Sequence, residues 1–403
     1  MRILFTVAYL DGYHGSVLHV REIAEYLASA KGGNHNVTVG SIFITSEIER
    51  MFKTRGINVF LLGSIDVSIR YDIVFAYHFP TIEFLLKRGL QCKKMVLGTL
   101  SGYEYLETLP NFHKNSSMII AMSEEARSNH CELYGFEEGC IGILENCIPD
   151  KFVDFKFTHE LPEDIPKRIA VVSNHVPAEL WKMKEYLPVN TAVTYFGNGT
   201  ESYQEITPKV LSDYDVVVTI GKTVQYSMGL GIPVFEYDHF GGNGYITPSN
   251  MESEALTNFS GRSTMRKLSA EKLAMELVED YPKAKSDSNI LRQLAIDKFL
   301  LSIRVDELMN KILEAPNFSY DFTNVTYNEN LDFAHGEAFC NWTGALKSDN
   351  FILKQSIECY KKEIETLNDM IKKLNENIEA IQNTRGYKLL EFLRRIKRKI
   401  TFK

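Results

Sequence analysis

The sequence predicts an α/β protein built from two successive doubly wound parallel sheets, with a long helix towards its C-terminal end. From residue 1 to about residue 315, short runs rich in β-branched and aromatic residues alternate with stretches whose apolar residues recur at helical spacing. The alternation restarts after the proline- and acid-containing stretch 149–166. Alternating strands and helices are typical of parallel sheets covered by helices on both faces. The restart predicts a second sheet.

The first half of the chain supplies the elements of the first sheet. In the segment 16–30 the apolar residues stand at positions 17, 20, 23, 24 and 27, which is helical spacing. We expect strands at Ile3–Ala8, Val37–Ile44, Val59–Leu62, Ile73–Tyr77, Lys94–Gly98 and Met118–Ala121. We expect helices at Ser16–Ala30, Thr81–Arg88 and Glu124–Leu133.

The second half repeats the pattern. We expect strands at Arg168–Ser173, Thr191–Phe196, Val216–Ile220 and Val234–Tyr237, and helices at Pro177–Tyr186, Val224–Leu230, Leu273–Val278 and Leu291–Leu313. These elements predict an N-terminal domain over residues 1–155 and a second domain over 156–315, with a ligand cleft between them. Residues 316–349 are aromatic-rich without a regular period, so we expect a packed irregular connector there.

The C-terminal segment predicts a coiled coil over residues 350–384. Apolar residues step by alternating intervals of three and four through Ile357, Tyr360, Ile364, Leu367, Ile371, Leu374, Ile378 and Ile381. Isoleucine at the a positions, with leucine at two d positions, favours a parallel two-stranded coiled coil, and hence a homodimer. The alternative is a single amphipathic helix packed on the protein's own body.

Residues 385–403 form a basic tail with eight Lys/Arg and the single acid Glu391. Leu389, Phe392, Leu393, Ile396 and Ile400 share one helical stripe. The basic residues Arg394, Arg395, Lys397, Arg398 and Lys399 lie largely away from that stripe. A basic amphipathic helix suits an anionic membrane surface. The alternative is a solvated basic end.

Composition narrows the class of protein. The 403 residues are 44% hydrophobic and 24% charged, as in ordinary globular proteins, and the net charge of −7 argues against a nucleic-acid partner. The first residues lack the pattern of a signal peptide, and no run approaches the length of a membrane span. The six cysteines show no C-x-x-C pair, so we interpret them as reduced thiols of a cytosolic protein.

Glycine-bearing loops follow the strands of the second domain. The strand Val216–Ile220 ends on Gly221-Lys222-Thr223, and the strand Val234–Tyr237 opens onto Asp238-His239-Phe240 and the glycines Gly241 and Gly242. Open α/β sheets bind ligands at this edge, where glycine lets amides approach an anion and a helix N-terminus adds favourable charge. With Lys222 beside them, these loops predict a site for a phosphate-bearing ligand. The alternative is that the turns simply need glycine.

The chain resembles the GT-B glycosyltransferases, especially bacterial family-4-like enzymes that build cell-surface polysaccharides. The resemblance covers about residues 1–315 and rests on the order of several strings. These are RILFTVAYLDGYHGS, DIVFAYHFPTIEFLL, ILENCIPDKF, DVVVTIGKTVQYSMGLGIPV, YDHFGGNGYITP and NFSGR, and the tail NTRGYKLLEFLRRIKRK is similar to the closing helices of such enzymes.

The resemblance implies two Rossmann-like domains, with a nucleotide-sugar donor held mainly by the second domain and no metal or other cofactor. Negative charge builds on the leaving diphosphate during sugar transfer, and preorganised amides with a cation lower that barrier. The expected donor-binding residues are Asn174, His175, Gly197, Gly221, Lys222, Thr223, Gln225, Tyr226, Gly241 and Gly242. Lys222 is also expected to act in catalysis.

Two positions depart from the family pattern. The family carries a ribose-binding glutamate five residues before the glycine of its G-x-P-V turn, where this chain has Tyr226. A second glutamate eight residues earlier is replaced by Val218. Ribose contact therefore uses other groups, or donor binding is weakened or lost.

The acceptor side is expected in the first domain. His14, flanked by Gly12, Tyr13 and Gly15, follows the first strand, and His78 ends the strand Ile73–Tyr77. A histidine has the pKa for a general base, so both are catalytic candidates, the alternative being structural hydrogen-bonding. Asp213-Tyr214-Asp215 spells a metal-binding D-x-D, but it leads into a buried strand, so we expect no metal site.

Together these features predict a cytoplasmic glycosyltransferase of hexosyltransferase type, peripheral to the inner face of the cell membrane. It would move sugar from a nucleotide sugar to a lipid-linked or polysaccharide acceptor. One alternative is a non-catalytic, glycosyltransferase-like partner subunit of a glycan assembly complex. Another is an epimerase of the same fold, which would have no use for a membrane-directed tail.

Overall fold

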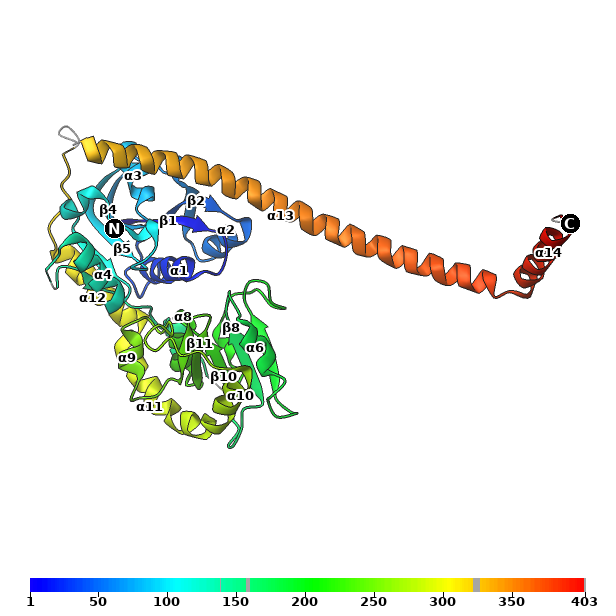
Figure 1. Cartoon of the computed structure of the whole chain (residues 1–403). Coiled ribbons are helices and arrows are strands. Elements are labelled where there is room, and N and C mark those ends of the chain that lie inside the picture. The colour runs from blue at the N-terminus through cyan, green and yellow to red at the C-terminus, as the bar shows by residue number, and fades with distance from the viewer. Residues whose placement is uncertain (138, 157–159, 322–326, 402–403) are drawn as a thin grey trace. The chain divides into compact units, whose positions relative to one another are not determined.

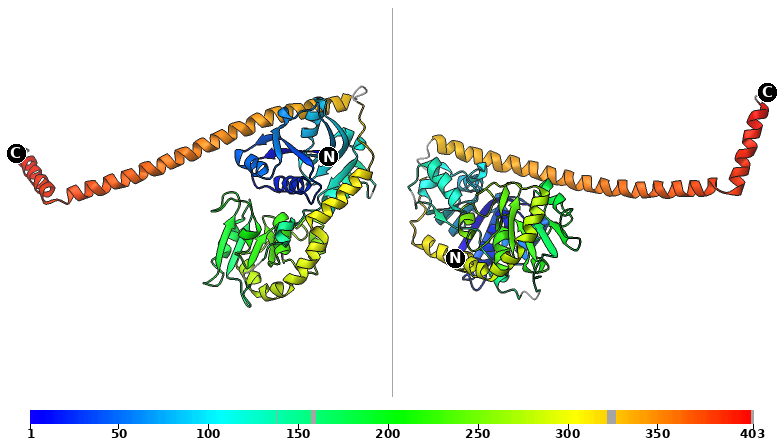
Figure 2. Two further views of the ribbon diagram at one scale, coloured as in Figure 1. Left: turned by 180° about the vertical axis from the view of Figure 1, so that it is seen from behind. Right: turned by 60° about the horizontal axis from the view of Figure 1, so that its bottom comes forward.

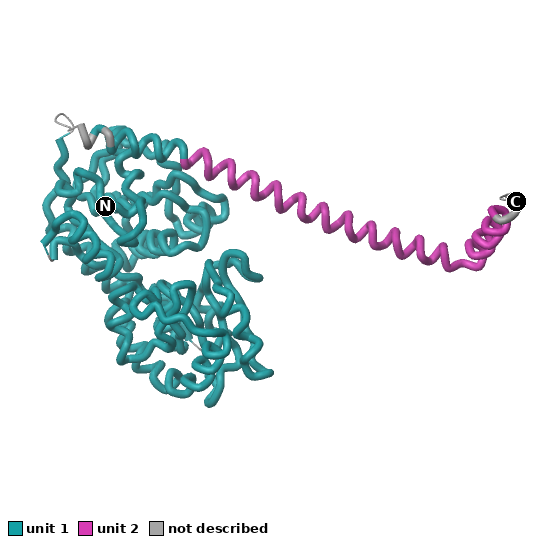
Figure 3. The backbone as a smooth tube through the Cα atoms, viewed as in Figure 1, with its two compact units in different colours: residues 1–342 teal, residues 343–403 magenta. Residues whose placement is uncertain are grey.

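The computed structural model describes residues 1–137, 139–156, 160–321 and 327–401. The chain divides into two compact units, residues 1–342 and residues 343–403 (Figure 3). The larger unit contains two lobes, each built on one sheet (Figure 1).

The first lobe contains a seven-stranded, wholly parallel sheet in the order β3-β2-β1-β4-β5-β6-β7. Its strands are β1 (Arg2–Leu10), β2 (Asn36–Ile44), β3 (Asn58–Leu61), β4 (Arg70–Tyr77), β5 (Gln91–Thr99), β6 (Met118–Ala121) and β7 (Gly142–Ile143). Its helices are α1 (Gly15–Ala28), α2 (Ser46–Lys53), α3 (Pro80–Lys87) and α4 (Glu124–Tyr134), with short 3-10 turns at Leu62–Ser64, Tyr105–Glu107 and Asn111–Asn115. Alternate residues of β1 enter opposite cores, because side chains along a strand alternate between the two faces.

The second lobe contains a five-stranded sheet in the order β12-β11-β10-β8-β9, in which only the β11–β12 pair is antiparallel. Its strands are β8 (Arg168–Val172), β9 (Ala192–Phe196), β10 (Val216–Thr219), β11 (Val234–Asp238) and β12 (Gly241–Tyr245). Its helices are α5 (Asp150–Val153), α6 (Ala178–Met183), α7 (Pro208–Leu211), α8 (Lys222–Leu230), α9 (Met251–Ala255), α10 (Ala270–Glu279) and α11 (Tyr281–Phe299).

The parallel first sheet and the mainly parallel second sheet confirm the predicted fold class, and each expected strand of both domains is present with ends shifted by a few residues at most. The expected helix Leu291–Leu313 is instead two helices, α11 and α12 (Leu301–Glu314), separated at Leu300. Leu300 has an extended backbone, which breaks the helix.

The end of the expected second domain at residue 315 is wrong. Val305, Leu308 and Ile312 of α12 are buried in the core of the first lobe, together with residues of α1 and β1. The chain therefore crosses back at Phe299–Leu301, where Ile148 accepts a hydrogen bond from the Leu301 amide at 2.9 Å and donates one to the Phe299 carbonyl at 2.8 Å. Local helix spacing identified α12, but only its packing partners reveal to which lobe it belongs.

The expected irregular connector over 316–349 is also wrong for most of its length. Helix α13 (Tyr327–Gln382) begins inside it, while residues 322–326 of the connector lie outside the described residues. Phe333 and Cys340 of α13 are each 6% exposed and belong to the second core of the first lobe. Helical spacing is present in this segment, at Phe333, Gly336 and Cys340. The pattern is too short to have predicted the helix.

The smaller unit contains the rest of α13 and the helix α14 (Arg385–Thr401), drawn in orange and red in Figures 1 and 2. Heptad residues along α13, from Ile357 to Ile381, are about half exposed or more in the single chain. Residues 402–403 of the basic tail lie outside the described residues. Within the described parts of the chain, no helix combines the length and apolar character needed to cross a bilayer.

Candidate functional site

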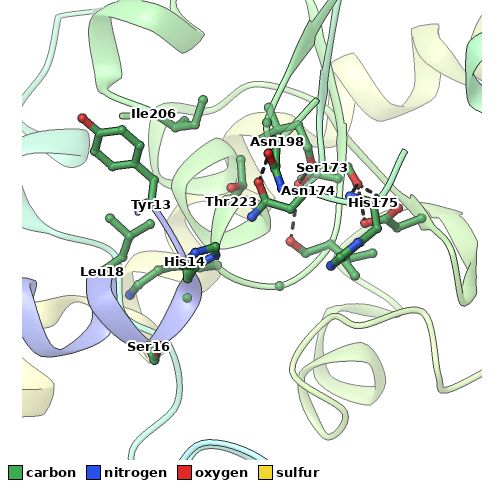
Figure 4. A pocket seen from close by; sticks show the side chains of 18 of the residues that line it. Tyr13, His14, Ser16, Leu18, Ser173, Asn174, His175, Asn198, Ile206 and Thr223 are labelled. Atoms are coloured by element: carbon green, nitrogen blue, oxygen red, sulfur yellow. Dashed lines mark hydrogen bonds between the residues drawn. The ribbon is translucent and has the colours of Figure 1, made fainter. Parts of the chain in front are cut away.

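A cavity of about 510 Å³ lies between the carboxyl edges of the two sheets. Most of its lining comes from the loops that follow β1, β4, β5, β6 and β7 in the first lobe and from the ends of β8, β9, β10 and β11 and the loops after them in the second. Loops that follow parallel strands meet at one edge of a sheet, so residues far apart in sequence converge here. Figure 4 shows Tyr13 and His14 on one side of this cavity and Ser173, Asn174, His175 and Asn198 on the other.

The second-lobe wall is held together by hydrogen bonds between neighbouring loops. Asn174 Oδ1 accepts a bond from the Asn198 amide at 3.0 Å, which joins the loop after β8 to the loop after β9. Gly197 permits this approach: its φ is +132°, and a Cβ there would lie 1.9 Å from the Ser173 carbonyl oxygen. Any side chain at residue 197 would therefore separate the two loops.

A buried carboxylate joins this wall from the last residue of β11. Asp238 is 3% exposed and accepts bonds from the Ser173 hydroxyl at 2.9 and 3.0 Å and from the His239 amide at 2.8 Å. Burial raises the pKa of Asp238, and the hydrogen bonds from Ser173 and His239 oppose that rise. The rings of His175 and His239 lie beside it with centroids 5.5 Å apart. The second lobe thus offers the cavity one carboxylate and two imidazoles.

Two helices begin at the cavity. Gly221 lines the cavity immediately before α8 with φ +63° and ψ −138°, a conformation suited to glycine, and no atom crowds its missing side chain. The Lys222 and Thr223 amides precede the first intrahelical bond of α8, which runs from Val224 to Gly221. In the first lobe, α1 begins after His14, whose side chain makes no capping bond. Amides in the first turn of a helix have no intrahelical acceptor, so the N-termini of α1 and α8 give the cavity a favourable potential for an anion.

Lys222 lines the cavity, but its ammonium group is already paired. Nζ donates to Glu22 Oε2 at 2.6 Å, and both side chains are almost fully buried. Tyr226 donates to the other Glu22 oxygen. The expected role of Lys222 was to present its charge to a phosphate; in the structure this charge is compensated across the lobes by a carboxylate of α1. Glu22 has no sequence signal, because only tertiary packing brings α1 to α8.

In the first lobe, His78 and Glu107 form a buried pair in the cavity wall. His78 has φ +59°, and its Nδ1 accepts a bond from the Ala8 amide at 3.0 Å. A neutral imidazole that accepts at Nδ1 carries its proton on Nε2, which lies 3.2 Å from Glu107 Oε1. The other Glu107 oxygen accepts from the Leu100 amide at 2.8 Å. Both nitrogens of His78 are therefore occupied, whereas His14 is 45% exposed and has Asp11 3.5 Å from its Nε2.

The structure brings most of the expected site residues together. The cavity lining includes Tyr13, His14, Gly15, His78, Asn174, His175, Gly197, Gly221, Lys222 and Thr223. The cavity is also lined by Glu107, Asn146, Ser173, Asn198 and Tyr203, which were not expected there. Asp238 and His239 line it as well; they belong to a loop predicted to reach the site, but they were not among the expected site residues. Ser173, Asn198 and Asp238 adjoin the ends of strands, which could have identified them. Glu107 follows no strand directly and has no such signal.

Five expected residues lie outside the lining. Gly241 and Gly242 belong to β12, where a Cβ on Gly242 would lie 1.9 Å from the Glu236 carbonyl oxygen, so glycine serves sheet packing there. Gln225 is fully buried, and its amide, oriented to donate, reaches the Gly221 carbonyl oxygen at 2.8 Å. Tyr226 stacks on Phe152 with centroids 4.2 Å apart. Gly12 packs against the Tyr203 hydroxyl.

No group of three or more His, Cys, Asp or Glu among the described residues has the arrangement of a metal site. Asp215 of the D-x-D string is fully buried and accepts bonds from the Lys167 and Arg168 amides at 2.7 and 2.8 Å. These bonds give Asp215 a structural task at the start of β8.

Comparison with protein-family models finds no match, and comparison with curated proteins finds none either. Among solved structures, the chain is similar to a glycosyltransferase from Rickettsia africae ESF-5, with a TM-score of 0.51 and 14% identity over 78% of this chain and 98% of that one. It is also similar to the apo form of the lipopolysaccharide outer core galactosyltransferase WaaB, with a TM-score of 0.50 and 10% identity over 78% of this chain and 99% of that one.

These similarities concern the fold. The chain has the two-lobed GT-B fold of glycosyltransferases, as the resemblance implied.

Proposed function

We propose that the protein is a glycosyltransferase that binds a nucleotide-sugar donor in the cavity between its lobes. One observation carries the proposal: four parallel strands of the second sheet, β8 to β11, each send the loop at their carboxyl end into this cavity, and α8 begins there on Gly221. The cavity of about 510 Å³ lies within the size range of sites for small ligands. The two glycosyltransferase structures of the same fold support this reading.

The chemistry follows from what the cavity offers. When the sugar leaves its nucleotide, negative charge grows on the diphosphate, and the Lys222 and Thr223 amides at the α8 N-terminus can stabilise it. The Lys222 ammonium adds to this stabilisation without leaving Glu22, because it has three donors. Because Val218 is buried in β10 and Tyr226 contacts Glu22, we assign the ribose contacts to polar groups of the second-lobe wall, such as Asn174 and Asp238.

On the acceptor side, we propose that His14 and its neighbours Tyr13 and Gly15 contact the acceptor, with His14 as the candidate base because it is the more open of the two histidines. We further propose transfer of a hexose without a metal cofactor. The acceptor would be a lipid-linked or polysaccharide glycan at the cytoplasmic face of the cell membrane, where α14 would bind anionic lipid. Residues 350–384 would join two copies of the chain.

The test begins with a thermal-shift screen of nucleotide sugars, because a ligand that binds only the folded state raises the melting temperature by mass action. Hydrolysis or transfer with the donor that binds then compares the wild type with Lys222→Ala. We expect turnover to fall at least tenfold, which corresponds to about 1.4 kcal/mol. Lys209→Ala, an exposed lysine of α7 in the same lobe, is the matched control. Unchanged turnover in Lys222→Ala would remove the assigned role of this side chain.

A second candidate function is a non-catalytic partner subunit. The observation that favours it is the buried Lys222–Glu22 pair, since Glu22 already compensates the lysine charge and, with the Tyr226–Glu22 bond, links the two lobes. Calorimetry separates the two functions. The partner role predicts that no nucleotide sugar gives heat on titration. It also predicts a stable complex with another glycan-assembly protein.

A further inference from the structure

The loop between β5 and β6 has one side in the cavity and another under helix α13. On the cavity side it supplies Leu100 and Glu107, the latter held by His78 as described above. On the other side, Phe112 of this loop stacks on Phe333 of α13 with centroids 6.1 Å apart and planes 20° apart. This loop contains short 3-10 turns at Tyr105–Glu107 and Asn111–Asn115 but neither a strand nor an α-helix. Long loops of this kind often populate more than one conformation. Contacts with α13, which covers this loop, can therefore fix its conformation.

The first turns of α13 pack tightly on the first lobe, beside α3 as seen in Figures 1 and 2. A Cβ on Gly336 would lie 2.8 Å from the Cβ of Glu83, so glycine lets the two helices approach closely. The Cys340 thiol contacts the Pro80 carbonyl oxygen at 3.4 Å, and Lys87 of α3 pairs with Glu337. Contacts at successive turns fix this part of α13 on the lobe.

A short chain of contacts leads from α13 to the cavity. The ring centroids of Phe339 and Tyr105 lie 6.4 Å apart. The ring of Tyr105 in turn packs edge-on against that of Phe79, with centroids 5.3 Å apart. The Phe79 amide donates to the Leu106 carbonyl oxygen at 3.0 Å. Phe79 adjoins His78, and Leu106 adjoins Glu107, so this bond ties together the two backbones that carry the buried pair.

We propose that the first turns of α13, from Phe333 to Cys340, hold the β5–β6 loop in the geometry that places Glu107 and His78 in the cavity, with Phe339 as a positioning residue that acts through Tyr105. The strained φ of His78 supports this role, since such a backbone persists only where its surroundings enforce it. Because α13 is continuous to Gln382, the helix that carries the heptad also helps to shape the site.

The first experiment measures hydrogen exchange in the full-length chain and needs no ligand. Phe339→Ala is compared with Trp342→Ala, which removes a larger aromatic side chain from the same helix at a position that is 71% exposed. We expect Phe339→Ala to speed exchange of the Leu100 and Glu107 amides at least about tenfold, with no change in residues 172–175 of the second lobe. Trp342→Ala should match the wild type, and Phe339→Tyr should restore slow exchange.

The second experiment rests on the proposed function and follows hydrolysis of whichever nucleotide sugar the wild type accepts. Phe339→Ala should lower kcat at least about tenfold and leave KM for the donor within about twofold, because the donor contacts lie mainly on the second lobe. Phe339→Tyr should recover the rate. The inference would be overturned if Phe339→Ala matched the wild type both in hydrogen exchange of the β5–β6 loop and in kcat. A wild type that binds no nucleotide sugar would contradict the proposed function alone, since the exchange experiment still decides the inference.

Discussion

Replacing Glu83 with Gln is expected to stabilise the protein at neutral pH. Glu83 lies on α3 beneath Gly336 of α13, is fully buried, and has no hydrogen-bond partner for either carboxyl oxygen among the described residues. Burial, with a smaller contribution from Asp332, raises the pKa of Glu83 from 4.5 to about 9. The folded protein therefore keeps this carboxyl neutral at pH 7, whereas the unfolded chain ionises it.

The magnitude follows from proton linkage. Below the unfolded pKa of 4.5 both states bind the proton, so the contribution of the neutral carboxyl is fully present. As the pH rises from there to the folded pKa of about 9, the unfolded state releases its proton first, and stability falls by about 1.4 kcal/mol per pH unit. From 4.5 to pH 7 the loss is about 3 kcal/mol. Gln cannot ionise, so Glu83→Gln should remove this loss.

Urea unfolding followed by circular dichroism, at about pH 5, 7 and 8.5, measures the effect on the transition of the first lobe. The free-energy difference between Glu83→Gln and wild type should be below about 1 kcal/mol at pH 5, about 3 kcal/mol at pH 7 and larger at pH 8.5. Glu132→Gln, an exposed position on α4 of the same lobe, is the control and should not change the pH dependence. A difference that is constant across this range would refute the reasoning, because it would show that Glu83 ionises normally in the folded state.

Three further predictions concern the site, the heptad and the tail. Gly197→Ala should destabilise the second lobe by about 2–4 kcal/mol and abolish nucleotide-sugar binding in thermal-shift assays, since a Cβ would meet the Ser173 carbonyl oxygen at 1.9 Å; Gly63→Ala, with no atom near its Cβ, should change neither. Replacing Ile364 and Ile371 with Lys should convert a dimer to a monomer in light scattering, while Asp369→Lys, away from the seam, should not; a wild-type monomer would contradict the coiled coil. Deleting residues 385–403 should abolish sedimentation with phosphatidylserine vesicles, because each basic residue near the lipid contributes about 1 kcal/mol; continued sedimentation of the truncated chain would assign membrane binding elsewhere.

Much of the fold could be predicted because its signals are local. The strand Met118–Ala121 has the predicted bounds, and the helix expected at 16–30 is α1, Gly15–Ala28. Alternation of such elements identified both parallel sheets. The first turns of α13 escaped prediction because few apolar residues mark them, and their main support is a surface of α3 far away in sequence.

The candidate site, like the fold, contains residues that local sequence patterns predict and residues that they do not. Asn174, Gly197 and Gly221 stand at strand ends, and parallel strands deliver such residues to one edge of a sheet, so position in the sequence was enough to predict that they meet at the cavity. Gly241 and Gly242 fit the same pattern but form the antiparallel strand β12, whose pairing with β11 is not encoded locally. Glu107 reaches the cavity from a loop that no strand or helix signal describes.

The sequence alone determined two successive α/β sheets, a heptad helix and a cluster of polar and glycine residues at strand ends, because hydrophobic period and chain order act over short distances. Only the tertiary structure decided that Glu22 neutralises Lys222, that α12 returns to the first lobe and that α13 covers the loop carrying Glu107. Each of these depends on which surfaces bury one another, and burial joins residues more than one hundred positions apart that no local pattern relates.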